Sequence, residues 1–340
     1  MSKSVAAWLF ICAALLFVTT QVGAITRLTE SGLSMVEWKP VTGALPPLNE
    51  QDWQHEFSLY QTSPQYQKVN AGMSLDDFKH IYFWEWLHRL LDRVLGVVYF
   101  IPFIWFWRTE KISSTARKPL AAIFLLGAAQ GALGWFMVKS GLVNRPAVSH
   151  YLLAAHLMLA LTIFCCLLRA GFIFSGVSTF LVKLAPMRNL VRVAVGFVAA
   201  TMIWGAFTAG LRAGVLYGDT FPMMGNHLWP GEIFNLSPAW LNFFENAATV
   251  QFTHRVLAVL TFCLLLTTAA RGLKLNPGSK LLMALGTMAF VQVGLGITTL
   301  VTHVNVAIAT LHQAGAIIIL ALLMAILHNI PCKGETHESR

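Results

Sequence analysis

The sequence contains few charged residues, and acidic ones are the scarcer kind. Only 11% of its 340 residues are charged, with 15 Asp and Glu against 24 Lys and Arg. So little charge excludes an ordinary soluble domain, which needs a polar surface to contact water. Cysteine is also scarce, with five residues, and all of them fall in expected spans or on the expected cytoplasmic side, none in an outer loop. No disulfide is therefore predicted.

Long apolar runs take the place of charge. The chain is 56% hydrophobic, with a mean hydropathy of +0.63. A membrane-spanning helix needs about 20 mostly apolar residues, and eight runs meet that requirement. They cover residues 5–26, 81–107, 119–138, 149–171, 190–211, 249–270, 281–301 and 306–328. The sequence predicts an all-α polytopic membrane protein with eight transmembrane helices.

The distribution of the basic residues predicts the orientation of these helices. If the N-terminus is cytoplasmic, the inner segments hold roughly twice as many Lys and Arg residues as the outer ones, the bias expected of cytoplasmic loops. The first outer loop is acidic overall. We therefore expect a multi-pass protein of the bacterial inner membrane with both termini in the cytoplasm. The net charge of +9 orients the helices and requires no nucleic-acid partner.

A set of landmarks recurs in the same order in the two halves of the chain. The corresponding elements are Gly23-Ala24 with Gly205-Ala206, Thr26 with Thr208, Gly32 with Gly214, QGALG at 130–134 with QVGLG at 292–296, and His156 with His312. This pattern indicates an internal duplication of a four-helix unit. We expect two pseudo-symmetric four-helix bundles, residues 1–175 and 176–340, related by an axis along the membrane normal.

Four of the eleven histidines lie at duplicated positions. His88, His156, His254 and His312 each fall one or two turns inside the outer face, two in each half. Two imidazoles at similar depth on facing helices suit bis-histidine heme ligation. A zinc site would need more Cys or carboxylate ligands at that depth, and simple packing of the histidines is the other alternative. The remaining histidines, including His150 and His303, are read as interfacial, loop or cytoplasmic residues.

Two arginines directly follow paired histidines. Arg89 follows His88 and Arg255 follows His254. An arginine at this depth suits binding of a heme carboxylate. It could equally extend its side chain to the lipid headgroups, and the sequence leaves both readings open.

Carboxylates distinguish the two halves. Glu85 and Asp92 flank His88, whereas the aligned positions in the second half are Gln251 and Ala258. A carboxylate beside only one histidine pair suggests that the first bundle performs chemistry and that the second holds a redox cofactor. Glu85 would then move protons or stabilise a developing cation. The alternative is a structural ion pair with Arg89, four residues further along the helix.

These residues together resemble the heme A synthase family. The stretch Glu85–Arg89 is similar to its E-x-x-H-R element, and GAITRLTESGLSMVEWKP (23–40) to the segment that follows its first helix. The other three histidines resemble the family's in SHYLLAAHL, Thr253-His254-Arg255 and ATLHQAG. The likeness is strongest to the mitochondrial and alphaproteobacterial branch, because the outer-loop cysteine pair of another bacterial branch is missing.

The resemblance implies an oxidoreductase that converts the C8 methyl group of heme O to a formyl group, with oxygen derived from water, giving heme A for cytochrome oxidase. By the same resemblance Glu85, His88 and His156 hold heme O, and His254 and His312 ligate a resident heme b. Both sites would face the outer side. Heme O synthase and cytochrome oxidase assembly factors are the candidate partners besides membrane lipid, and a homo-oligomeric state stays open.

Two rival functions account for the same histidines. A diheme b-type electron-transfer cytochrome would also use four, but its hemes usually stack across the membrane. A heme carrier or assembly factor would bind heme without turnover. Glu85 separates a carrier from an enzyme, since only an enzyme should need it.

Overall fold

The computed structural model describes residues 2–39, 42–142, 146–176 and 182–331. These residues are predominantly helical, and eight of their helices are long and apolar enough to span a membrane. The eight are α1 (Lys3–Leu28), α4 (Leu75–Arg108), α5 (Ser114–Leu142), α6 (His150–Ser175), α7 (Arg188–Gly210), α9 (Ala247–Leu275), α10 (Lys280–Val301) and α11 (Val306–Asn329). The prediction of an all-α polytopic membrane protein is confirmed.

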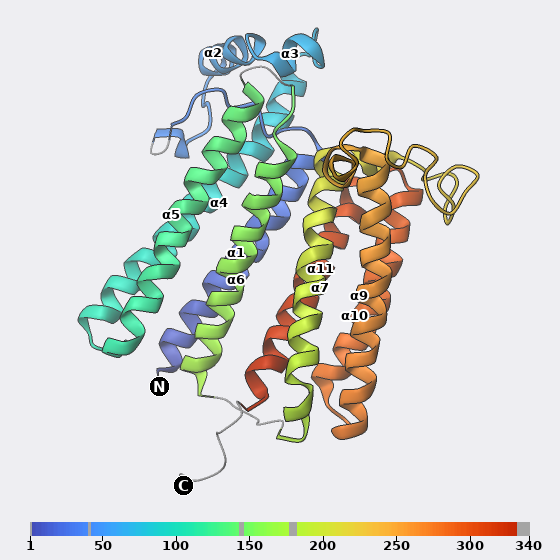
Figure 1. Ribbon diagram of the computed structural model, residues 1–340. Coiled ribbons are helices and arrows are strands. Elements are labelled where there is room, and N and C mark those ends of the chain that lie inside the picture. The colour runs from blue at the N-terminus through green and yellow to red at the C-terminus, as the bar shows by residue number, and fades with distance from the viewer. Residues whose placement is uncertain (1, 40–41, 143–145, 177–181, 332–340) are drawn as a thin grey trace. The chain divides into compact units, whose positions relative to one another are not determined.

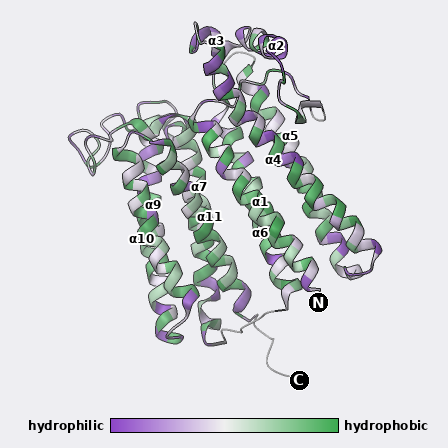
Figure 2. Ribbon diagram, turned by 180° about the vertical axis from the view of Figure 1, so that it is seen from behind, coloured by the Kyte–Doolittle hydropathy of each residue, from purple (hydrophilic) through white to green (hydrophobic). Residues whose placement is uncertain are grey.

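The chain divides into two compact units, one of residues 8–164 and one of residues 165–340 together with residues 1–7. The predicted boundary between residues 175 and 176 stays a prediction, and residues 177–181 just after it lie outside the described part. Figure 2 shows hydrophobic residues along the helix shafts and hydrophilic ones gathered near helix ends and on the two short helices of residues 50–61 and 64–68.

In the first unit, polar side chains link successive helices. The indole of Trp8 on α1 donates to the carbonyl of Val98 on α4 at 2.8 Å. The hydroxyl of Tyr99 on α4 donates to the carbonyl of Leu120 on α5, also at 2.8 Å. Between α5 and α6, the amide of Gln130 donates to the carbonyl of His156. Such bonds hold helices together where burial of apolar surface gives no driving force, as in lipid.

A small helical layer covers the N-terminal end of α4 in this unit (Figure 1). It comprises η1 (Thr42–Ala44), α2 (Glu50–Gln61) and α3 (Pro64–Lys68). Met35, Tyr60, Phe78 and Tyr82 form its core, with Tyr60 and Phe78 fully buried. Ser74 caps α4 by accepting a hydrogen bond from the backbone N–H of Asp77, as Ser at an N-cap does. α4 therefore begins before its apolar run, and the predicted site residues Glu85 and His88 lie several turns after its first residue.

The second unit packs α7, α9, α10 and α11 against one another. Thr201 on α7 and Thr261 on α9 share a hydrogen bond of 2.7 Å between their hydroxyl groups. The amide of Gln292 on α10 donates to the carbonyl of His312 on α11 at 3.0 Å, which repeats the link at Gln130. Four short elements complete the unit, namely η2 (Val182–Met187), η3 (Ala213–Val215), η4 (Ala239–Leu241) and α8 (Asn242–Glu245).

Candidate functional site

The first predicted histidine pair comes together within the first unit. His88 lies on α4, and His156 lies six residues into α6. The two imidazoles are close enough for their charges to interact, and Asp92 is within the same range of His156. One carboxylate oxygen of Asp92 lies 4.0 Å from Nε2 of His88. Two imidazoles and one carboxylate therefore lie near one another on α4 and α6.

The second predicted pair comes together in the same way. His254 lies on α9 and His312 lies six residues into α11, again within electrostatic range of each other. Nδ1 of His254 is 3.0 Å from the backbone carbonyl of Thr201. A carbonyl can only accept, so this contact favours the tautomer that is protonated at Nδ1 and leaves the lone pair of Nε2 free for a metal.

One histidine of each pair has a buried nitrogen without a hydrogen-bond partner among the described residues. These nitrogens are Nδ1 of His156 and Nδ1 of His312. A buried polar atom without a partner is costly. Among the described residues there is also no group of three or more His, Cys, Asp or Glu that could hold a metal ion. Each site is thus a two-imidazole set, the ligand number that a bis-histidine heme iron takes from protein.

Glu85 lies at the junction of α4 with the loop after α1. It is 2% exposed, and one of its carboxylate oxygens accepts from the hydroxyl of Ser34 at 2.7 Å and from the backbone N–H of Met35 at 2.9 Å. Its other oxygen pairs with the guanidinium of Arg89 at 2.5 Å. The ion pair that the sequence offered as an alternative for Glu85 is therefore present within α4, and the bonds from Ser34 and Met35 to Glu85 fasten the loop to the helix.

Both terminal nitrogens of Arg89 donate hydrogen bonds in the same network. Besides Glu85, it donates to the backbone carbonyls of Met35 and Glu37. Its guanidinium also lies 5.1 Å from the centre of the Trp38 ring, within the range of a cation–π contact.

The second unit repeats this junction without the charge. The amide of Gln251 donates to the backbone carbonyls of Ala213 at 2.9 Å and Leu216 at 2.7 Å, in the loop after α7. The aligned side chains thus bind their loops with opposite polarity, since the carboxylate of Glu85 accepts where the amide of Gln251 donates.

Arg255 differs from its counterpart Arg89 in having unused donors. One of its nitrogens donates to the carbonyls of Pro222 and Met223 at 3.3 Å. Nε and Nη2 of Arg255 are buried and have no partner among the described residues. Two free guanidinium N–H groups beside a histidine pair suit a carboxylate ligand, which Arg binds through two parallel bonds.

The other histidines considered from the sequence make their contacts away from the two histidine pairs. His303 pairs with Asp219 at 3.1 Å, and the ring of His150 lies against that of Tyr151, with ring centres 4.1 Å apart and planes tilted by 36°. His337 lies outside the described residues. Sequence reasoning missed Ser34 and the carbonyl of Thr201 as contacts of the site. Only the position of Ser34 in the 23–40 segment could have indicated the first, and a backbone carbonyl leaves no trace in a sequence.

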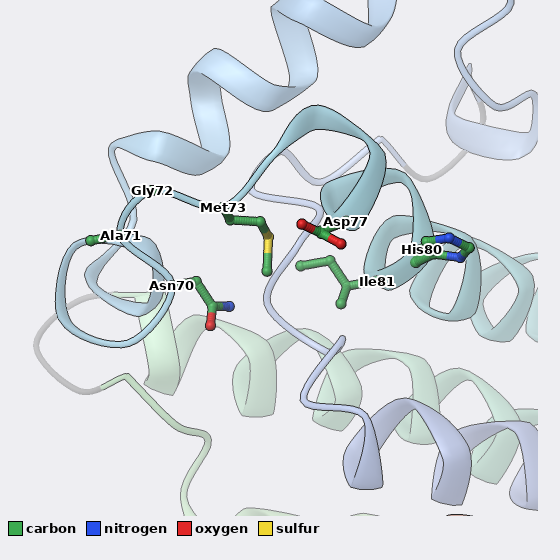
Figure 3. A pocket seen from close by; sticks show the side chains of 7 residues that line it. All are labelled: Asn70, Ala71, Gly72, Met73, Asp77, His80 and Ile81. Carbon is green, nitrogen blue, oxygen red and sulfur yellow. The ribbon is translucent and has the colours of Figure 1, made fainter.

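A hollow of about 510 Å³ lies elsewhere on the first unit, at the start of α4 (Figure 3). Its lining consists of Asn70, Ala71, Gly72, Met73, Asp77, His80 and Ile81. None of the predicted site residues belongs to this lining. The candidate site is therefore defined by the histidine pairs and not by this hollow.

Known proteins resemble the chain along nearly all of its length. Residues 6–324 match the COX15-CtaA family, described as cytochrome oxidase assembly protein. A heme A synthase of Rhodospirillum centenum is 47% identical over 337 residues, covering 96% of this chain and 88% of that protein. Heme A synthases of Nitrosospira multiformis and Parvibaculum lavamentivorans are 43% and 44% identical, each covering 96% of this chain and 94% of its relative. The resemblance noted from the motifs is confirmed.

Proposed function

The chain belongs to the COX15-CtaA family of cytochrome oxidase assembly proteins, and on that premise we propose that it acts as a heme A synthase. The observation that carries this proposal is the likeness to heme A synthases over nearly the whole length of both chains. The geometry supports it independently, because each unit brings two histidines together, and one histidine of each pair has a buried nitrogen without a partner among the described residues.

The proposed reaction oxidises the C8 methyl group of heme O to a formyl group. Two successive two-electron steps, each adding oxygen from water and releasing two protons, convert the methyl group to an alcohol and then to a geminal diol. Loss of one water from the diol gives the aldehyde of heme A. Overall, one methyl group and one water yield one formyl group, four protons and four electrons. The acceptor of these electrons is an external oxidant.

The first unit is the proposed substrate site. His88 and His156 would hold heme O through its iron. Asp92 lies beside them, with a carboxylate oxygen 4.0 Å from Nε2 of His88. Glu85 would act as the catalytic carboxylate. Three donors surround it, an arrangement that suits a fixed negative charge more than a mobile proton carrier. A fixed charge would stabilise a cation developing at the substrate carbon.

The second unit is the proposed site of a resident heme b. His254 and His312 would ligate it, and the free N–H groups of Arg255 would bind a propionate. We assign Arg89 a lesser part in heme binding, because Glu85 and two carbonyls already occupy its donors. A bound heme b would supply one-electron redox chemistry.

The location of the reaction also belongs to the proposal. We place the protein in the bacterial inner membrane with both termini in the cytoplasm and both histidine pairs toward the outer face, as the distribution of basic residues predicts. Heme O synthase is the proposed source of the substrate, and cytochrome oxidase assembly factors are the proposed recipients of the product.

Heme extraction from cells that co-express this chain with a heme O synthase tests the function. We expect chromatography to show heme A with the unsubstituted chain, and heme O in its place with Glu85→Ala. Glu85→Gln is the matched variant, since its one amide oxygen can still accept from Ser34 and Met35 while the charge that pairs with Arg89 is removed. Heme b bound to the purified protein with heme O unchanged in the cells would refute the synthase and favour a cytochrome or carrier. Heme A formation by Glu85→Ala would refute the role of Glu85.

A further inference from the structure

All four predicted heme ligands pack against a glycine on a neighbouring helix. A Cβ atom placed on Gly23 would lie 3.0 Å from Nε2 of His88, and one on Gly134 would lie 3.0 Å from Cε1 of His156. In the second unit, a Cβ on Gly205 would lie 3.1 Å from Cε1 of His254, and one on Gly296 would lie 2.8 Å from Cε1 of His312. We call Gly23, Gly134, Gly205 and Gly296 the ring-contact glycines.

These contacts are shorter than ordinary packing distances, since carbon atoms pack best at about 3.5–4.0 Å. An alanine methyl group at Gly23, Gly134 or Gly205 would require the imidazole to give by a few tenths of an ångström, and at Gly296 the ring would have to shift. Other helical glycines do not share the feature. Gly131 on α5, Gly196 on α7 and Gly294 on α10 have nothing within 4 Å of a built Cβ. Contact with a histidine ring is therefore not a general property of glycine in these helices.

A second contact fixes the backbone at two of the rings. Gln130 precedes Gly134 by one helical turn, and its amide donates to the carbonyl of His156. Gln292 stands in the same relation to Gly296 and donates to the carbonyl of His312. The duplicated Q-x-x-x-G pattern thus holds the ligand helix through the glutamine and admits the imidazole ring at the glycine.

We propose that the ring-contact glycines are positioning residues that set the orientation of the four imidazoles toward heme iron. The inference rests on the proposed function, because it takes the four histidines as heme ligands. The position and angle of an axial imidazole control how it binds iron and tune the metal's electronic properties. A methyl group at any of the four glycines would turn or push the ring away from that position.

Small residues also let membrane helices approach each other closely, so the test has to separate ring positioning from helix packing. The first comparison uses the full-length protein purified with its heme b. We expect Gly296→Ala to lower the affinity for heme on the order of tenfold. It should also alter the electron paramagnetic resonance g-values of low-spin bis-histidine heme. Gly294→Ala, two residues away on the same helix, should retain the heme and the g-values of the unsubstituted protein. Gly205→Ala and Gly196→Ala form the corresponding pair on α7.

The second comparison removes the imidazole ring of His312 by His312→Ala. It measures the melting temperature of the heme-free protein with and without Gly296→Ala. If Gly296→Ala acts through the imidazole, it lowers the melting temperature in the unsubstituted protein but not in a His312→Ala background. An equal drop in both backgrounds would show that Gly296 serves helix packing, and would overturn the inference, as would unchanged g-values and heme retention in Gly296→Ala and Gly205→Ala. Absence of low-spin heme from the unsubstituted protein would instead refute the proposed heme sites, and this inference with them.

Discussion

The ion pair between Glu85 and Arg89 should be strongly coupled, and a double-mutant cycle can measure the coupling. The two side chains are 3% and 10% exposed, so removing either one leaves the other charged group buried without its partner. Breaking a buried pair in this way costs about 3–5 kcal/mol. Glu85→Ala would also release the hydroxyl of Ser34 and the N–H of Met35, which places it at the upper end of that range.

The double variant Glu85→Ala/Arg89→Ala should cost much less than the sum of the single variants. Neither charge is then left alone, so we expect a coupling free energy of about 2–3 kcal/mol, near the upper limit for directly contacting residues. For a unit of this size 1 kcal/mol corresponds to about 2–4 °C in melting temperature. Each single variant should therefore melt on the order of 10 °C lower.

Thermal unfolding in detergent, followed by tryptophan fluorescence, provides the assay. Glu85→Gln serves as the control, because an amide still accepts from Ser34 and Met35 and should lose only part of the stability. Additive shifts in the double variant would refute the reasoning, since they would mean that Glu85 and Arg89 stabilise the loop independently of each other.

Three further predictions concern other parts of the chain. Gln251→Glu places a carboxylate against two backbone carbonyls in place of an amide donor. It should cost about 2–4 kcal/mol, and a melting temperature equal to that of the unsubstituted protein would contradict this. Phe78→Ala empties the core of the outer helical layer, where Phe78 is fully buried, and should cost about 3–5 kcal/mol and speed proteolysis of residues 42–74. The hydrogen bond from Lys39 lowers the pKa of Glu37 from 4.5. The contribution of this Lys39–Glu37 bond to stability is therefore present above pH 4.5 and is lost as the pH falls through the lowered pKa of Glu37. Because both side chains are partly exposed, the contribution should stay below about 1 kcal/mol. Melting curves between pH 5 and pH 3 should show this loss in the unsubstituted protein and not in Lys39→Met.

The membrane-spanning helices could be predicted from the sequence to within a few residues. Their length and apolar composition are local properties that lipid imposes on each segment separately. The start of α4 at Leu75 was equally predictable, because Ser74 and Asp77 form a local capping pair. That the two histidines of each pair come together could be predicted from the duplication and from their similar depth in the membrane.

The partners of Glu85 could not be predicted in the same way. The sequence offered a catalytic role and an ion pair with Arg89 as alternatives for Glu85. It gave no sign of Ser34 and Met35, which lie 51 and 50 residues earlier in a loop without a repeating pattern. Likewise, Gly23-Ala24 and QGALG stood out as landmarks of a duplication. Their contacts with imidazoles became evident only when neighbouring helices were placed side by side.

The ring-contact glycines also show how small the recurring unit is. Each lies on the membrane-spanning helix that immediately precedes the one carrying its histidine: α1 before α4, α5 before α6, α7 before α9 and α10 before α11. The chain is therefore a series of four helical hairpins, each with a glycine on its first arm and an imidazole on its second. One hairpin is enough to orient one imidazole, whereas each proposed heme site takes imidazoles from two hairpins. During synthesis, each imidazole can thus be oriented as soon as its own hairpin has entered the membrane, and each proposed heme site is completed only when the second hairpin of its pair follows.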